Sequence, residues 1–138
     1  MYGSLDISTS GMVAERTRFA SISANIANRN TLVDAQGRYN PYRRREVMFA
    51  PGDPNASSEE GRALGVHVAR VSINEGALTE RHDPDHPFAD DRGYIKVPDI
   101  NPIVEQLNAM EAVRSYEANV QAAEATKTML SQALRLLA

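Results

Sequence analysis

Residues 101–138 read NPIVEQLNAMEAVRSYEANVQAAEATKTMLSQALRLLA, and this stretch decides the fold. Apolar or small side chains recur in it every seven residues, at Ala109, Tyr116, Ala123, Leu130 and Leu137. A second series lies three or four residues away from the first, at Val113, Val120 and Leu134. This alternating spacing is typical of a helix that packs lengthwise on another helix. With Asn101 as N-cap and Pro102 at the first helical position, the stretch predicts a helix that runs nearly to Ala138.

The same seven-residue period appears near the other end of the chain. It is carried there by Leu5, Met12, Phe19 and Ile26. The segment predicts a first helix that begins after the N-cap Ser4 and ends near Asn28. Gly11 lies inside this helix, where Gly costs about 1 kcal/mol relative to Ala. We therefore expect a neighbouring backbone to approach Gly11 closely.

The middle of the chain is rich in Pro, Gly, Asp and Arg and predicts short strands tied by loops. Alternating patterns place strands at residues 43–49, 66–73 and 94–97, with a bulge near Ala69 in the second. Turn-forming residues predict a loop over residues 51–61.

The expected fold class is α+β, mainly α, with long N- and C-terminal helices that form a coiled-coil-like pair around a small irregular β-rich middle region. The expected domains are an N-terminal helical segment (residues 1–31), a β and loop region (residues 32–100) and a C-terminal helical segment (residues 101–138).

Composition excludes several classes of function. A net charge of -3 provides no general attraction to nucleic acid. The absence of Cys excludes disulfides and thiolate metal sites. No apolar run approaches the roughly 20 residues that span a bilayer, so membrane insertion is not expected. Residues 1–7 contain no basic stretch and lead into no continuous apolar segment, so we expect no cleavable secretory signal.

One stretch groups side chains that bind metals. Residues 82–86 read HDPDH and are followed by Asp90 and Asp91, and His with carboxylates is a usual ligand set for zinc. Pro84 and Pro87, however, impose an extended path with diverging side chains, which favours a hydrated turn. We expect no metal and no other cofactor.

Two further groups have a chemical and a structural interpretation. Arg43, Arg44 and Arg45 stand beside Tyr39 and Tyr42, a composition also found at phosphate and nucleic-acid sites. Arginines on a strand more often solvate a sheet edge or pair with acids of a neighbouring subunit.

Serines at positions 8, 10, 21 and 23 lack a base partner, since every His lies at positions 67, 82 and 86. No catalytic residue is expected, and an enzyme is not predicted.

The chain resembles a known family. Ser10-Gly11 followed by Ala14, and then ISANIAN at residues 22–28 with Thr31, resembles the N-terminal signature of bacterial flagellar rod and hook proteins. Three further motifs in the same order are similar to those of proximal rod members: PYRR at residues 41–44, DPDHP at residues 83–87 and YEANV at residues 116–120. The resemblance covers essentially the whole chain.

The resemblance implies a structural subunit of the flagellar rod, whose terminal helices form an inner tube around an export channel and transmit torque. It also implies a location in the basal body as part of the periplasmic rod, with export through the flagellar type III apparatus. The implied partners are other rod proteins and copies of the chain, the export apparatus, and the membrane ring or its adaptor. A soluble coiled-coil adaptor or export chaperone is the alternative, because it would use the same heptads.

The heptad positions and the asparagines near the first helix end are the expected assembly interface. They are Leu5, Met12, Phe19, Ile22, Asn25, Ile26, Asn28, Val113, Tyr116, Asn119, Val120, Leu130, Leu134 and Leu137. Of these, Tyr116, Val120, Leu130 and Leu134 are expected to pack against Met12, Phe19 and Ile26, within or between subunits. Asn25 and Asn28 are expected to bond backbone groups where the first helix ends.

Overall fold

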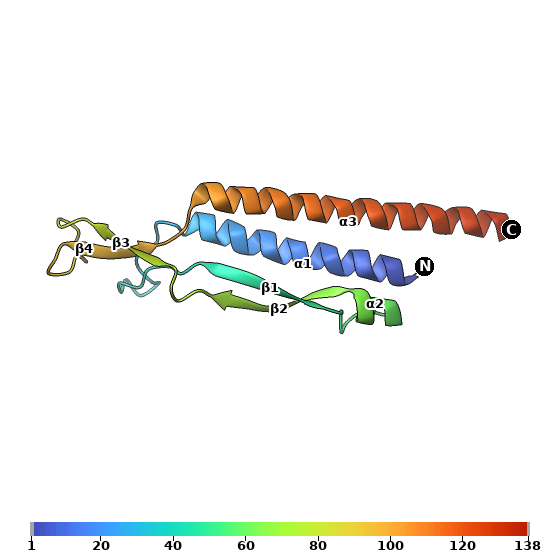
Figure 1. Cartoon of the computed structure of the whole chain (residues 1–138), viewed down its shortest axis with the longest axis horizontal. Coiled ribbons are helices and arrows are strands. Elements are labelled where there is room, and N and C mark those ends of the chain that lie inside the picture. Colours follow the sequence, from blue (N-terminus) through green and yellow to red (C-terminus); the bar gives the residue numbers. More distant parts are fainter. Residues whose placement is uncertain (1, 138) are drawn as a thin grey trace.

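The computed structural model describes residues 2–137 and shows an elongated chain built on two long helices (Figure 1). In chain order the elements are α1 Tyr2–Ala27, β1 Arg45–Pro51, α2 Glu59–Leu64, β2 Val66–Ile73, β3 Leu78–His82, β4 Tyr94–Pro98 and α3 Pro102–Leu137. The predicted fold class is confirmed. In sequence order, the two long helices are separated by four strands that form two small antiparallel sheets. At 1.5 Å per residue, the 36 residues of α3 span about 54 Å. Asn101 caps α3 as predicted, because its Oδ1 accepts the Ile103 N–H at 3.0 Å.

The helix α1 lies between the other layers of the molecule. α3 packs along one side of α1, whereas β1, β2 and α2 pack along the other (Figure 1). The long helices are antiparallel, since Asn25 near the end of α1 contacts Glu105 near the start of α3. The β3–β4 hairpin lies at the end of the molecule away from both termini (Figure 1). Among the described elements, α3 therefore has a close neighbour on only one of its sides.

Small side chains bring the two long helices close together. Ala14 of α1 and Ala112 of α3 are both 1% exposed. A Cβ built on Gly11 would lie 2.8 Å from the Asn119 side-chain amide. The predicted close approach at Gly11 is thus present, but the neighbour is a side chain and not the expected backbone.

The seven-residue period in α3 is carried by small and polar residues. The buried members Glu105, Ala112 and Thr126 are seven or fourteen residues apart. This row runs one position before the predicted series Val113, Val120 and Leu134. Because α1 and α3 pack closely along this row, the seam admits only short side chains or a hydrogen-bonded one. The larger residues of the predicted series accordingly lie beside the seam.

The two strand pairs form separate two-stranded sheets. β1 pairs with β2 and β3 pairs with β4, both antiparallel. The register between β1 and β2 passes over Ala69, since Met48 is opposite Arg70 and Phe49 is opposite Val68. The predicted bulge near Ala69 is confirmed.

Two elements were not predicted from the sequence. β3 has the sequence LTERH, which lacks an apolar alternation. α2 begins inside the segment predicted as a loop, so that prediction is wrong for residues 59–61. Ser58 caps α2 through a hydrogen bond from the Gly61 N–H, and the Asp6 carboxylate of α1 accepts the Ser58 N–H at 2.8 Å. The Ser58 cap is a local signal, whereas the Asp6 contact comes from 52 residues away and is not visible in a local sequence pattern.

The molecule buries little apolar surface. The buried apolar residues of the described chain are Ala14, Ile22, Ala77, Ile95 and Ala112. Its accessible surface is 9450 Å² for 15.1 kDa, whereas a compact monomer of this mass exposes about 7,100 Å². Among residues 2–137, no helix is long and apolar enough to span a membrane.

Candidate functional site

Asn25 lies where three elements meet. Its side-chain amide donates to the Arg45 carbonyl oxygen at 2.9 Å and to Glu105 Oε2 at 3.2 Å. Its Oδ1 accepts the Arg45 N–H at 2.9 Å and the Tyr42 hydroxyl at 3.0 Å. Asn25 is 1% exposed, and these four bonds use both of its donors and both of its acceptor positions. One side chain thereby joins α1 to β1 and to α3.

The phenol of Tyr42 is held protonated at this junction. Burial raises the pKa of Tyr42 above its usual value, Arg45 opposes the rise, and the nearby Glu105 adds to it. A protonated hydroxyl is the form that donates to Asn25.

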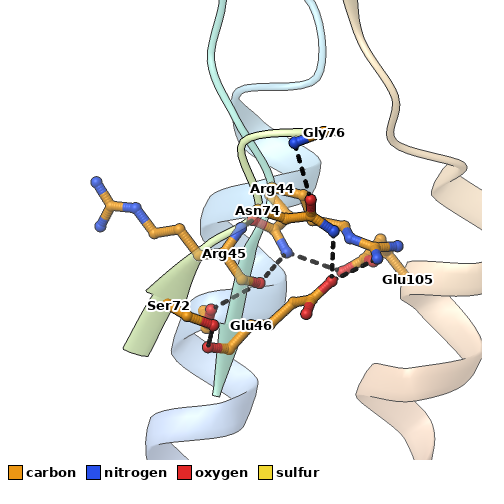
Figure 2. A network of polar contacts seen from close by, with 9 residues as sticks. Arg44, Arg45, Glu46, Ser72, Asn74, Gly76 and Glu105 are labelled. Carbon is orange, nitrogen blue, oxygen red and sulfur yellow. Dashed lines mark hydrogen bonds and ion pairs between the residues drawn. The ribbon is translucent and has the colours of Figure 1, made fainter. Parts of the chain in front are cut away.

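The start of β1 is stabilised by a network that includes one of the predicted arginines. Glu46 accepts hydrogen bonds from Arg44 and Asn74, and Asn74 in turn accepts the Gly76 N–H (Figure 2). These two bonds, with Asn74 first, lower the pKa of Glu46 below its usual value. Arg44 is therefore paired within the chain, while the Arg45 guanidinium lies 5.8 Å from the centre of the Tyr42 ring. A cluster of three free arginines for a phosphate is not present.

A shallow groove runs between α1 and α3. Its lining residues are Glu15, Arg16, Phe19, Ala112, Val113, Tyr116 and Glu117, and its volume is about 360 Å³. The structure thus brings together three predicted interface residues, Phe19, Val113 and Tyr116, within one chain. All three are exposed at the groove.

Charged side chains link the same two helices. Arg18 of α1 lies 3.7 Å from Glu15 on its own helix and 3.4 Å from Glu111 of α3. Burial raises the pKa of Glu15, Arg18 opposes the rise, and Glu111 adds to it. The Arg18–Glu111 pair is compatible with the antiparallel alignment of the helices and contributes only weakly to it, because both side chains are partly exposed.

The remaining predicted residues fall into three groups. Ile22 is buried, and Leu5, Met12, Ile26, Val120 and Leu130 are half-buried. Asn28 and Asn119 make local bonds, to the carbonyls of Ala24 and Ser115 respectively. Leu134 is exposed near the end of α3. The side chain of Leu137 lies outside the part that the structure describes.

Sequence reasoning missed the outer face of α3. Ile103, Leu107 and Met110 are 67%, 60% and 55% exposed. Their spacing of four and three residues places them on one face of the helix, opposite Ala112. The sequence contains this face as apolar residues at positions i, i+4 and i+7. It was overlooked because sequence reasoning followed the seven-residue period further along the helix.

Ser10, which the sequence analysis excluded as a nucleophile, has a structural role that was not predicted. Ser10 is buried, donates to the Ile7 carbonyl at 2.7 Å and accepts the Val66 N–H at 3.0 Å. It therefore fastens the start of β2 to α1. No local sequence signal identifies this role, because the partner is 56 residues away.

The HDPDH stretch begins at His82, the last residue of β3, and continues into the first part of the connection to β4. Asp90 accepts the N–H groups of Arg92 and Tyr94, and these bonds, Tyr94 first, lower its pKa. Among the described residues, no three His, Cys, Asp or Glu side chains gather in a way that would hold a metal ion.

Comparison with known proteins identifies the family. The family model described as "Flagellar basal body rod FlgEFG protein C-terminal" matches residues 91–136, which include β4 and nearly all of α3. The flagellar basal-body rod protein FlgC of Bacillus subtilis is 35% identical, over 98% of this chain and 97% of the relative. FlgC of Borreliella burgdorferi is 32% identical, over 99% and 97%.

FlgC of Salmonella typhimurium is similar to the same extent, with 32% identity over 95% of this chain and 93% of the relative. These relatives match along nearly their whole length, so the similarity includes both long helices and the region between them. From this similarity, and from the antiparallel helix pair that it spans, the chain belongs to the FlgC family of flagellar basal-body rod proteins.

Proposed function

We propose that this chain polymerises through α1 and α3 with other rod subunits, and that the helix pairs form the hollow shaft around the export channel. Membership of the family makes the chain a structural rod subunit and not an enzyme. Beyond family membership, α1 and α3 are the elements that would carry the assembly, and the contacts between them and the strand region would transmit torque through each subunit.

The observation that carries this proposal is the unpartnered outer face of α3. A lone helix pair in water would expose Ile103, Leu107 and Met110 at a cost, since burial of such side chains contributes about 1.5–3 kcal/mol each. The chain also exposes about 2,400 Å² more than a compact monomer of its mass. A surplus of this size is comparable to the area buried in large protein interfaces.

The Asn25 junction supports a role in torque transmission. Its hydrogen bonds join α1 to α3 and to β1, so a rotation of the helix pair is passed to the strand region without a flexible link. The groove residues Phe19, Val113 and Tyr116 supply a further exposed surface for neighbouring subunits.

The proposal includes the route and the neighbours of the chain. Export through the flagellar type III apparatus would deliver it to a periplasmic rod, and contact with the membrane ring or its adaptor would anchor the shaft. These partners follow from the resemblance to rod proteins, and the exposed helical faces are the surfaces that would meet them.

A soluble coiled-coil adaptor or export chaperone is not favoured. Such a protein would use the helix pair alone, whereas similarity to FlgC extends across the strand region as well.

The experiment is deletion of the gene in its own bacterium, with complementation by the wild-type chain. Swimming is scored and isolated basal bodies are imaged by electron microscopy. Loss of swimming with basal bodies that lack a complete rod is expected, and the wild-type chain should restore both. Complete rods and normal filaments in the deletion strain would contradict a structural role.

A further inference from the structure

Each of the two sheets has one edge that a side chain covers. At β1, the Asn25 Oδ1 accepts the Arg45 N–H and the Asn25 amide donates to the Arg45 carbonyl oxygen, both at 2.9 Å. At β4, the Tyr39 hydroxyl accepts the Lys96 N–H at 2.8 Å and donates to the Lys96 carbonyl oxygen at 2.7 Å. In both places one side chain bonds the two backbone groups of one strand residue, as a neighbouring strand would. The chain itself therefore protects β1 and β4 at these positions.

The free edge of β2 has no such cover. In an antiparallel pair, facing residues alternate between those that exchange hydrogen bonds and those whose backbone groups point away from the partner strand. Arg45 bonds outward to Asn25, so its partner Ile73 also points its backbone away from β1, and the same holds two residues away at Val71. No described residue accepts the N–H of Val71 or Ile73. Their side chains are 46% and 57% exposed, and we call these two residues the β2 open edge.

β3 has an open edge of the same kind. Lys96 bonds outward to Tyr39, so its partner Glu80 points its backbone away from β4. The alternation places Leu78 and His82 in the same orientation. Among residues 2–137, none accepts the N–H of these three residues. Glu80 and His82 are exposed and Leu78 is half-buried, and we call the three residues the β3 open edge.

Unpaired strand edges attract further strands. Exposed N–H and C=O groups in a row form a template, and strand addition to such an edge is a common mode of protein recognition. Natural edges are usually protected by a charged side chain, a proline or a covering element. The β2 open edge has β-branched apolar side chains instead, and these favour a strand partner. Val71 and Ile73 therefore form a surface that an additional strand would cover.

The two open edges lie in regions of opposite charge. Ile73 lines a hollow of about 260 Å³ together with Arg43 and Arg45. Neither guanidinium group forms an ion pair with a described residue. The hairpin of residues 78–98, by contrast, contains five acidic and three basic residues, which leaves a net charge of -2 with His neutral. Its Glu80 forms no ion pair with a described residue either, so the charges that would meet between the two edges are available.

We propose that β3 of a second copy pairs with the β2 open edge and extends the β1–β2 sheet by one strand. The inference rests on the proposed function and adds a contact between strand regions to the contacts between helices. Backbone groups that lack partners in the single chain would pair across the contact. Glu80 of the second copy would approach Arg43 and Arg45 beside Ile73.

The charges favour this contact over a symmetric one. Two copies joined through their β2 open edges would bring the arginines of both together, and two copies joined through β3 would bring Glu80 of one against Glu80 of the other. A contact between different surfaces of identical subunits generates a ring or an open helical array. Both arrangements suit a tubular shaft.

Proline substitution at the open edges tests the strand pairing. Val71→Pro removes an N–H that points away from β1, and proline is tolerated at an edge position whose N–H faces solvent. The variant should keep the urea midpoint of the wild-type chain but should reduce the amount of chain in isolated basal bodies several-fold. Glu80→Pro should do the same from the other side of the contact.

The matched control is Val71→Thr, which keeps the N–H and the β-branched shape. It should be incorporated like the wild-type chain. A Val71→Pro chain that folds and is incorporated like the wild type would overturn the strand pairing and leave the structural role intact. A loss with Val71→Thr equal to that with Val71→Pro would also overturn it, because the contact would then depend on the side chain.

Disulfide trapping identifies the partner without any proline variant, because the natural chain has no Cys. Two differently tagged copies, Ile73→Cys and Glu80→Cys, are expressed in one strain. In oxidised basal bodies we expect a dimer that carries both tags, since facing residues of adjacent strands have Cβ atoms about 5 Å apart. Val71→Cys is combined with Glu80→Cys in the same way, so that two registers are sampled.

The trapping experiment has a clear positive result and two contrary ones. A mixed dimer with Ile73→Cys or Val71→Cys supports the contact, provided that Gln121→Cys, exposed on α3, gives none with Glu80→Cys. Dimers with Ile73→Cys alone would show a symmetric contact. Assembled rods without any mixed dimer would show that β3 of a second copy does not occupy the edge. Either of these last two results would overturn the proposal.

Discussion

Asn25 shows how a single polar side chain can hold three elements together. Buried amides are costly unless every donor and acceptor is paired, and here the Arg45 backbone, Tyr42 and Glu105 supply the partners. The sequence predicted that Asn25 bonds backbone groups near the end of the first helix. It did not predict that the backbone belongs to β1 or that α3 contributes a carboxylate, because both partners are distant in the chain.

Replacement of Asn25 tests this junction. Asn25→Ala leaves the Arg45 backbone and the Glu105 carboxylate without their partner, so it should lower the free energy of unfolding by about 3 kcal/mol. Asn28→Ala removes only a local cap and should cost about 1 kcal/mol. Urea denaturation followed by circular dichroism measures both values. Equal losses in the two variants would show that Asn25 is no more than a second cap.

Glu15 makes the helix pair sensitive to pH. Because burial raises its pKa above the ordinary 4.5, the folded chain keeps the Glu15 proton at a pH where the unfolded chain has released it. The contribution of Glu15 to stability therefore falls as the pH rises through 4.5 and on through the folded pKa. Glu15→Gln should flatten the dependence of unfolding free energy on pH in this window and stabilise the chain at neutral pH.

The control for Glu15→Gln is Glu117→Gln, which alters an exposed carboxylate in the same groove. Its urea midpoints should follow those of the wild-type chain at each pH. A Glu15→Gln variant that is less stable than the wild type at neutral pH would mean that the Arg18 contact outweighs burial.

At the scale of elements, the closeness of α1 and α3 depends on Gly11. Gly11→Val places a branched side chain against Asn119 and should cost about 2 kcal/mol of unfolding free energy. Asn119→Ala in the same chain provides room and should recover most of that loss. Ala20→Val, at an exposed position of α1, should change stability by less than about 0.5 kcal/mol. Additive losses in the double variant would contradict the contact.

The elements also show what a sequence can and cannot reveal. The long helices were predictable because seven-residue periods and the Asn101-Pro102 start are local signals. The buried row of α3 lies one position before the predicted series. The prediction missed it because Ala112 is small and Thr126 is polar, so neither was recognised as a core residue. β3 and α2 were missed, since pairing with β4 stabilises β3 and the Asp6 carboxylate holds the Ser58 N–H before α2, and both partners are distant in the chain.

The whole molecule exposes more surface than a compact monomer of its mass. Many of its apolar side chains are therefore exposed in the single chain, and the candidate interface could be predicted only in part. Phe19, Val113 and Tyr116 line one groove within the chain, and their role in assembly stays a prediction. The exposed residues Ile103, Leu107 and Met110 on the outer face of α3 were overlooked, because sequence reasoning looked for apolar residues that a single chain buries. The sequence does not show which side of α3 is covered by α1, so it does not show which side remains exposed.

A charge introduced at Leu107, on the outer face of α3, separates folding from assembly. Leu107 is exposed, so Leu107→Asp should change the unfolding free energy by less than about 0.5 kcal/mol. The buried carboxylate would nonetheless prevent subunit contact, and complemented cells should not swim. Gln121→Asp changes a side chain that is already polar and exposed, on the same face of α3 about five turns after Ile103, and it should restore swimming to a deletion strain. Normal swimming with Leu107→Asp would contradict a role of the outer face of α3 in assembly.

The most direct measurement is a cryo-electron microscopy map of basal bodies isolated from the source bacterium, in which this chain is traced. The account predicts that α1 and α3 lie side by side in the rod wall and that Ile103, Leu107 and Met110 are covered by a neighbouring subunit. A map in which the outer face of α3 is bare, and only the strand hairpins contact neighbours, would contradict assembly through the helices.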